Sequence, residues 1–133
     1  MKRNVTELLL QMERRCGGLV TAPADPVNLE RLRRAALTAW RAMAGLYEVS
    51  DGVDAPNPGF VFYPVSKVLA QAYSPGSPGT TVGAFNFGDE LIITADGQLA
   101  QLDHETGEIF LTWESPEDFL EEELHILEEE VSV

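Results

Sequence analysis

Residues 91–113, which read LIITADGQLAQLDHETGEIFLTW, contain three runs of strand-forming residues separated by two turn signals. The first run, residues 91–95, leads into Asp96-Gly97, a dipeptide favoured at two-residue type I′ hairpin turns, whose two central residues both have positive φ. Residues 99–102 return as the partner strand. Gly107 then marks a second turn before a third strand at residues 109–113. The pattern predicts an antiparallel meander.

Helical patterns lie on both sides of this meander. Before it we expect a helix at residues 4–16 that stops at Gly17-Gly18, a helix at 29–44 with Asn28 as its N-cap, a short strand at 60–63 and a short helix at 65–73.

The last helix has the clearest start in the chain. Ser115 is expected as its N-cap, Pro116 occupies the first helical position, and Glu117-Asp118 follow where the helix dipole favours acids. An apolar stripe then recurs at helical spacing, formed by Leu120, Leu124, Leu127 and Val131. The order of elements predicts an α+β fold: an antiparallel β-meander sheet packed with N-terminal helices and a closing C-terminal helix. We expect residues 1–133 to form a single domain, since 133 residues is a common domain length.

Charge is the strongest compositional signal. The chain has a formal net charge of −13. The charge is unevenly distributed along the sequence, because residues 68–133 contain fifteen Asp and Glu and no Lys or Arg. Such a surface repels nucleic-acid phosphates and anionic membranes and speeds encounters with basic proteins. The plainer alternative is that the acidity only keeps the protein soluble.

Other features narrow the class of function. The single cysteine, Cys16, can form neither an internal disulfide nor a cysteine-based zinc site, and we expect it to be a small semi-buried side chain. The sequence shows no signal-peptide pattern and no apolar run of membrane-spanning length, so the cytoplasm is the expected location.

Three segments resemble the SUKH superfamily, which contains bacterial toxin-immunity proteins and fungal cell-wall-assembly regulators. They are Leu46–Gly52 (LYEVSDG), Asp103–Glu108 (DHETGE) and the Ser-x-x-x-Phe-Leu pattern of Ser115–Leu120 (SPEDFL), and the match covers roughly residues 29–127. The Leu-Pro pair that often precedes the first motif in that family is absent here. The resemblance implies an α+β fold without an active site, and a role in binding and neutralising a partner.

Candidate catalytic and metal-binding residues are few. His104 lies between Asp103 and Glu105, and we interpret these acids as solubilising or turn-capping groups, since on a strand they would face away from the histidine. Glu122 and His125 form one E-x-x-H pair, whereas carboxylate-bridged metal sites use two, so a solvent-facing pair is the preferred interpretation. We expect no catalytic residues, no metal site and no cofactor.

The leading hypothesis is an immunity-type protein that covers a basic toxin, such as a nuclease domain. The expected docking residues are Asp51, Asp54, Asp89, Glu90, Asp103 and Glu105. The alternatives are a regulatory or scaffold module without a toxin partner, and an enzyme.

Overall fold

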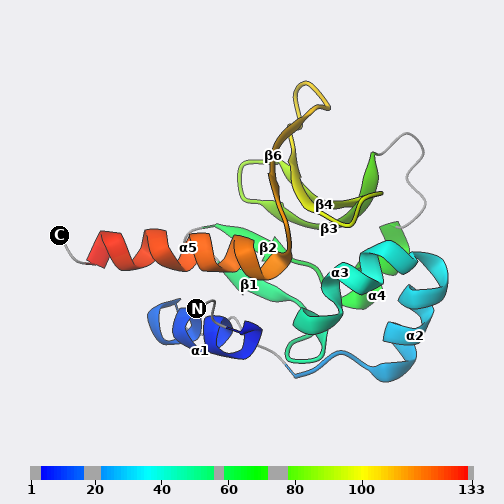
Figure 1. Cartoon of the computed structure of the whole chain (residues 1–133), viewed down its shortest axis with the longest axis horizontal. Coiled ribbons are helices and arrows are strands. Elements are labelled where there is room, and N and C mark those ends of the chain that lie inside the picture. Colours follow the sequence, from blue (N-terminus) through cyan, green and yellow to red (C-terminus); the bar gives the residue numbers. More distant parts are fainter. Residues whose placement is uncertain (1–3, 17–21, 56–58, 72–77, 132–133) are drawn as a thin grey trace.

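The part of the chain that the structure describes forms one sheet of six antiparallel strands, and each strand pairs with its neighbours in sequence (Figure 1). The computed structural model describes residues 4–16, 22–55, 59–71 and 78–131, without the side chains of 15–16 and 127–131. The strands are β1 (Val53–Ala55), β2 (Phe60–Phe62), β3 (Gly79–Phe85), β4 (Glu90–Thr94), β5 (Leu99–Leu102) and β6 (Ile109–Trp113). The sheet order is therefore that of a simple meander, with β1 and β6 at its two edges.

Five helices accompany the sheet in the described residues, which confirms the predicted α+β fold. They are α1 (Val5–Cys16), α2 (Pro26–Ala35), α3 (Leu37–Tyr47), α4 (Val65–Gln71) and α5 (Pro116–Val131). Helix α1 packs along α5, and α2 packs on α3 and α4 (Figure 1). Helix α3 contacts β4, and helix α4 contacts β3. No helix in the described part of the chain is both long and apolar enough to cross a membrane.

Phe119 is the centre of the core between α5 and the sheet. Its ring makes edge-to-face contacts with Phe60, Phe62, Phe85 and Trp113, with centroid distances of 4.9 to 6.0 Å. Edge-to-face packing is favourable because the positive edge of one ring meets the negative face of the next. Phe119 thus joins α5 to strands β2, β3 and β6.

The start of α5 is confirmed. Ser115 Oγ accepts a hydrogen bond from the Asp118 backbone N–H at 3.2 Å, and Pro116 is the first helical residue. Leu120 and Leu124 are fully buried as expected. The predictions for the side chains of Cys16, Leu127 and Val131, and for Gly17-Gly18, lie outside the described residues.

The single helix expected at residues 29–44 is wrong, because the structure has two helices with a break at Ala36. There φ is −151° and ψ is 77°. Helix α2 also begins earlier than expected: Asp25, not Asn28, is the N-cap, and its carboxylate accepts from the Val27 N–H at 2.8 Å. Alanine is the best helix former, so local propensity does not account for the break. Packing of α2 on both α3 and α4 accompanies it instead.

The first hairpin differs from the expected type I′ turn. Of the described residues, only glycines have positive φ, so Asp96 lacks the conformation that this turn requires. Thr94 donates its N–H to the Gln98 carbonyl, which leaves a three-residue loop that ends at Gly97 with φ of 84°. Three-residue hairpin loops commonly place a left-handed glycine at this position.

Candidate partner-binding surface

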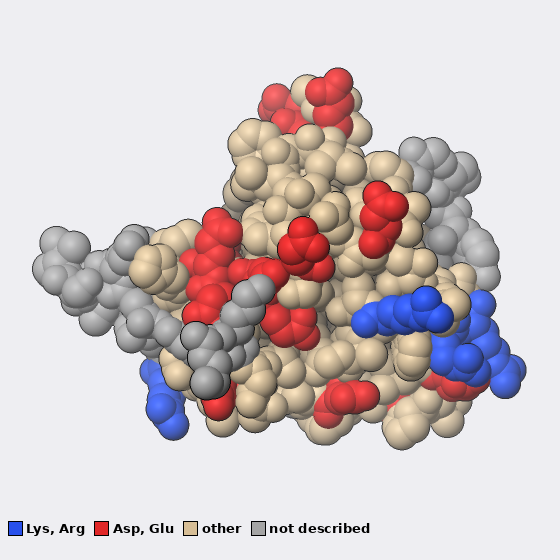
Figure 2. All heavy atoms as spheres, in the orientation of Figure 1, with Lys and Arg blue, Asp and Glu red and all other residues tan. Residues whose placement is uncertain are grey.

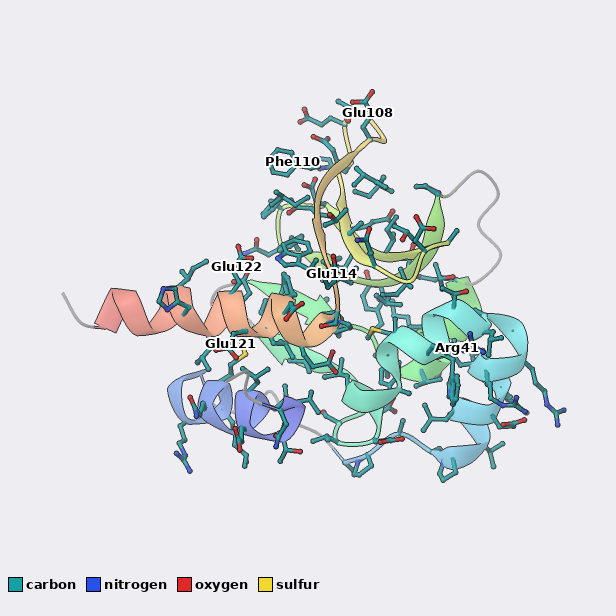
Figure 3. The ribbon with its side chains drawn as sticks, in the orientation of Figure 1. Arg41, Glu108, Phe110, Glu114, Glu121 and Glu122 are labelled. Carbon is teal, nitrogen blue, oxygen red and sulfur yellow. The ribbon has the colours of Figure 1, made fainter. Side chains whose placement is uncertain are left out.

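Strand β6 carries three consecutive exposed apolar side chains. Ile109, Phe110 and Leu111 have exposed fractions of 45%, 66% and 46%. The register between β5 and β6 shifts at this point, because Leu111 pairs with Gln101 and Ile109 pairs with Leu102, which leaves Phe110 as an extra residue in a bulge. Figure 3 shows the Phe110 side chain projecting from β6 near the loop of the β5–β6 hairpin. Contiguous exposed apolar residues of this kind are typical of interaction sites.

Acidic side chains surround this apolar strip. Glu108 lies at its upper end, at the tip of the β5–β6 hairpin, and Glu114 lies at its lower end, next to α5 (Figure 3). Both are exposed. Glu122 projects from α5 and accepts a hydrogen bond from the Trp113 indole N–H at 2.7 Å. We call residues 108–114 the β6 surface: an apolar centre with an acidic residue at each end.

The described basic side chains lie elsewhere. Figure 2 shows Lys and Arg gathered over α2 and α3, with a further group at α1, while acids cover the hairpin tip and the region around the base of β6. On α2, Arg33 and Arg34 both bind Glu30, and the Arg33 hydrogen bond is the main reason that the pKa of Glu30 falls to about 2. Lys67 lies 4.0 Å from the centre of the Tyr63 ring. No described cation therefore neutralises the β6 surface.

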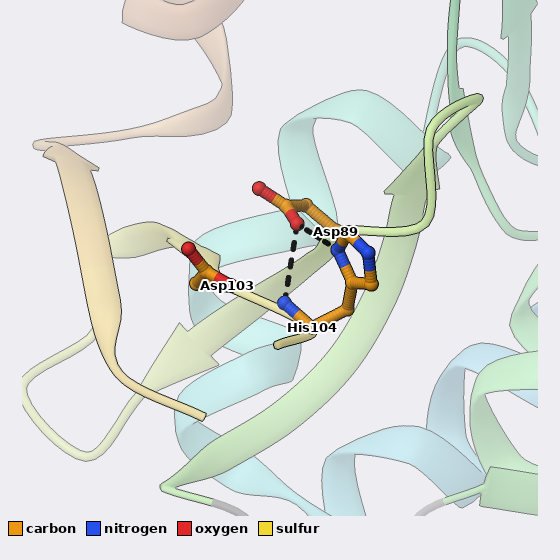
Figure 4. Close-up of side chains that lie close together, drawn as sticks. All are labelled: Asp89, Asp103 and His104. Carbon is orange, nitrogen blue, oxygen red and sulfur yellow. Dashed lines mark hydrogen bonds and ion pairs between the residues drawn. The ribbon is translucent and has the colours of Figure 1, made fainter. Parts of the chain in front are cut away.

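A cluster around Asp89 holds the loop of the β5–β6 hairpin (Figure 4). Asp89 is 6% exposed, and its carboxylate accepts from the Gln101 amide at 2.7 Å, from the His104 backbone N–H at 3.1 Å and from His104 Nδ1 at 2.5 Å. The His104 hydrogen bond is the main cause of the lowered pKa of Asp89, and the Asp89 hydrogen bond raises the pKa of His104. The cluster thus fixes the turn before β4 to the loop after β5.

The loop itself is shaped by Asp103. Its Oδ1 accepts from the backbone N–H groups of Glu105 and Thr106 at 2.7 and 3.2 Å, and the loop closes through Gly107, which has φ of 73°. Short side-chain-to-backbone bonds of this kind stabilise turns. They place Glu108 at the start of the arm that carries β6.

Asp89, Asp103 and His104 are also the one group of described side chains close enough to share a metal ion, with ligand atoms within 4.8 Å of one another. Several of their donor and acceptor atoms are already used within the protein. Both Asp89 oxygens accept protein hydrogen bonds, and Asp103 Oδ1 caps the loop backbone. A hydrogen-bonded structural cluster accounts for the contacts of Asp89 and of Asp103 Oδ1, and we assign no metal to it. No described serine, threonine or cysteine is bonded to His104 to act as a nucleophile.

The docking residues expected from the sequence do not share one surface. Asp54 is exposed on β1, at the edge of the sheet opposite β6. Asp51 accepts a hydrogen bond from the Val65 N–H at 2.9 Å and so supports the start of α4. Asp89 is buried in the cluster, and Glu90 is half-buried in β4.

Asp103 and Glu105 do lie on the hairpin that carries the β6 surface, and Glu105 is exposed. His104 lies in the turn of the hairpin and faces Asp89. Glu122 and His125 are both exposed, as the sequence predicted.

Sequence reasoning missed the exposure of Ile109, Phe110 and Leu111. A signal was present, because IFLTW has consecutive apolar residues where a strand with one solvent face would alternate. As the last strand of a meander, it also pairs with a single strand, β5, among the described residues.

The fold and this surface together define an α+β protein with an acidic, apolar-centred edge strand. Comparison with protein-family models, with curated proteins and with solved structures found no match to this chain.

Proposed function

We propose that this protein works by binding a basic protein, and that the β6 surface is its docking site. The observation that carries the proposal is the exposed run Ile109-Phe110-Leu111 with Glu108 and Glu114 at its ends. Apolar residues at the centre of an interface supply most of the binding free energy, and charged residues at the rim set on-rate and partner choice.

Binding rather than catalysis is supported by how the chemically reactive groups are used. Asp89 and His104 are the described residues that most resemble a catalytic pair. The Asp89 carboxylate is buried, however, and both of its oxygens accept hydrogen bonds from Gln101 and from His104, in the strand and loop that it positions. Two hollows in the described part of the chain differ in lining. One of about 420 Å³ lies on α2, where Glu30 in its lining is already paired with Arg34. The other, about 390 Å³ and between α3 and β4, has no titratable side chain in its lining.

The narrower proposal is an immunity-type role, in which the partner is a basic toxin. Its support is the resemblance of residues 46–52, 103–108 and 115–120 to the SUKH superfamily, together with the charge of the chain. One of those motifs, residues 103–108, is the loop that leads into the β6 surface. Toxins that act on nucleic acids have positive substrate channels, which an acidic surface complements.

The test is affinity purification of the tagged protein from its own cells at low salt and at about 0.5 M salt, at which exposed charges are strongly screened. Wild type is compared with E108Q/E114Q and with the control E7Q/E48Q, which removes two exposed acids on α1 and after α3. We expect one stoichiometric basic partner, lost at high salt and in E108Q/E114Q but retained in the control.

Two outcomes would contradict the proposal. Many substoichiometric partners would favour a scaffold module instead of an immunity-type protein. Equal capture by wild type and E108Q/E114Q would show that the β6 surface is not where the partner binds.

A further inference from the structure

Strand β6 has an outer edge that no strand in the described part of the chain covers. An open edge is a row of backbone donors and acceptors that another strand can pair with. Proteins often protect such edges with lysine, proline or very short strands, whereas β6 presents Ile109, Phe110 and Leu111. The outward-facing backbone groups of β6 decide where another strand can pair.

The hydrogen-bond alternation identifies those groups. Thr94 donates to Gln98, so in the β4–β5 ladder the hydrogen-bonded pairs are Thr94 with Gln98, then Ile92 with Ala100, then Glu90 with Leu102. Ala100 and Leu102 therefore direct their N–H and C=O groups toward β4.

Their partners in β6 are Thr112 and Ile109. Since these two face residues that turn toward β4, their own N–H and C=O groups point out of the sheet. The hydrogen bond from the Asp103 N–H to the Glu108 carbonyl agrees with this alternation, because it places a hydrogen-bonded pair next to the Leu102–Ile109 pair.

We propose that the partner binds by strand addition: an extended basic segment pairs with the outer edge of β6 through Ile109 and Thr112, covers the apolar strip, and places cationic side chains on Glu108 and Glu114. This inference rests on the proposed function and specifies its binding mode. Strand addition gives affinity through main-chain hydrogen bonds and specificity through side chains. The two acids are six positions apart, which in an extended chain is roughly 20 Å.

A second copy of this chain is a poorer occupant of the edge. Antiparallel pairing of two β6 strands about a twofold axis brings Glu108 of one copy close to Glu114 of the other, and each copy carries a net charge of −13. Like charges placed across a strand pair are destabilising. A segment with Lys or Arg at both ends and alternating apolar residues between them has the complementary pattern.

The matched variants are T112P and T112A. Proline removes the N–H that faces outward and leaves no missing bond to β5, because the Thr112 N–H does not point there, and proline is tolerated at such edge positions. Alanine removes the same side chain and keeps the N–H. The probe is a short synthetic peptide of alternating Val and Thr with lysines at both ends, and its control is the same peptide N-methylated between the lysines.

We expect saturable binding of the peptide to the wild type, about fivefold or more weaker binding to T112P than to T112A, and about tenfold or more weaker binding of the N-methylated peptide. Hydrogen exchange on the wild-type complex is the second measurement, for the case that T112P does not fold. It should show new protection at the Ile109 and Thr112 amides.

The inference is overturned if the peptide does not bind, if T112P and T112A bind alike, if N-methylation has no effect, or if the two amides gain no protection. A wild-type dimer in sedimentation that T112P abolishes would show that a second copy occupies the edge. Failure of the proposed function gives a different result, because E108Q/E114Q would then bind the lysine peptide as tightly as wild type does. If strand addition alone fails, E108Q/E114Q still binds the lysine peptide more weakly than wild type.

Discussion

The carboxylate of Asp89 accepts a hydrogen bond from His104 Nδ1 at 2.5 Å, although the two residues lie fifteen positions apart in the sequence. The same carboxylate accepts from the His104 backbone and from Gln101. This relationship joins the turn before β4 to the loop after β5, and it is the anchor from which the arm of β6 extends. Its energetic value can be measured directly.

We predict that D89A lowers the free energy of unfolding by about 1–3 kcal/mol, because it leaves the buried Gln101 amide without its acceptor. The measurement is urea denaturation followed by tryptophan fluorescence. D96A, which removes an exposed acid from the neighbouring hairpin, is the control and should change stability little. A loss in D89A no larger than in D96A would show that the cluster contributes little to the fold.

The Asp89–His104 pair also predicts a pH dependence. The pKa of His104 is raised above its ordinary 6.5, chiefly by Asp89 and also by Glu105 and Asp103, so its contribution is complete below pH 6.5 and is lost as pH rises through the raised pKa. The pKa of Asp89 is lowered below 3.8, so its contribution is present above pH 3.8 and is lost as pH falls through the lowered pKa.

The destabilisation caused by H104A should therefore be greatest between pH 3.8 and 6.5 and smaller on either side. Urea denaturation of wild type and H104A across this range measures it, and an NMR titration of the His104 imidazole checks the direction of its pKa. A destabilisation that does not vary with pH, or an imidazole that titrates below 6.5, would contradict the assignment.

The N-cap of α2 is Asp25 in the structure, whereas the sequence predicted Asn28. D25A should cost about 1 kcal/mol of stability, because the Val27 N–H loses its acceptor. N28A should be within about 0.5 kcal/mol of wild type, since Asn28 lies inside the helix and alanine is a better helix former. Thermal denaturation of both variants decides between the two caps, and the reverse order of effects would restore Asn28 as the helix start.

Phe110 should matter for binding and not for folding. F110S is expected to change the free energy of unfolding by less than about 0.5 kcal/mol, because the ring is 66% exposed, and to reduce capture of the partner by at least about tenfold. V27S is the matched control, since Val27 is 61% exposed on α2. A large loss of stability in F110S would mean that Phe110 is a packing residue, and equal capture by F110S and wild type would remove it from the docking site.

Local sequence signals were sufficient for much of the fold. Ser115, Pro116 and the acids after them define the start of α5 without help from the rest of the chain, and the strand-forming runs at residues 91–95 and 109–113 match β4 and β6 to within a residue. Three-residue strand β1 had no comparable signal, because a strand this short shows no alternation that can be recognised.

The pairing register of β4 with β5 could not be predicted from the sequence. A type I′ turn at Asp96-Gly97 would have paired Ala95 with Gln98, whereas the observed loop pairs Thr94 with Gln98, and one residue of slip turns every side chain to the other face. The meeting of Asp89 with His104 depends on that register. The break at Ala36 could not be predicted from local propensity either, because alanine favours helix; it coincides with the packing of α2 on both α3 and α4.

The acids predicted for docking differ from those of the β6 surface. The acidity of the C-terminal half indicated a basic partner, but choosing acids by their place in turns selected Asp51 and Asp89, whose carboxylates support α4 and the β5–β6 loop. Glu108 and Glu114, which we propose as docking acids, could not be selected from the sequence, because their place at the ends of an exposed edge strand depends on the fold.

The most direct test of the central claim is the dissociation constant of the purified partner for wild type and for E108Q/F110S/E114Q, each measured at low and at high salt. If the β6 surface is the docking site, the variant binds at least about 100-fold more weakly at low salt, and its affinity changes less with salt than that of the wild type. If the variant keeps wild-type affinity and salt dependence while remaining folded, the partner binds elsewhere and the account is wrong.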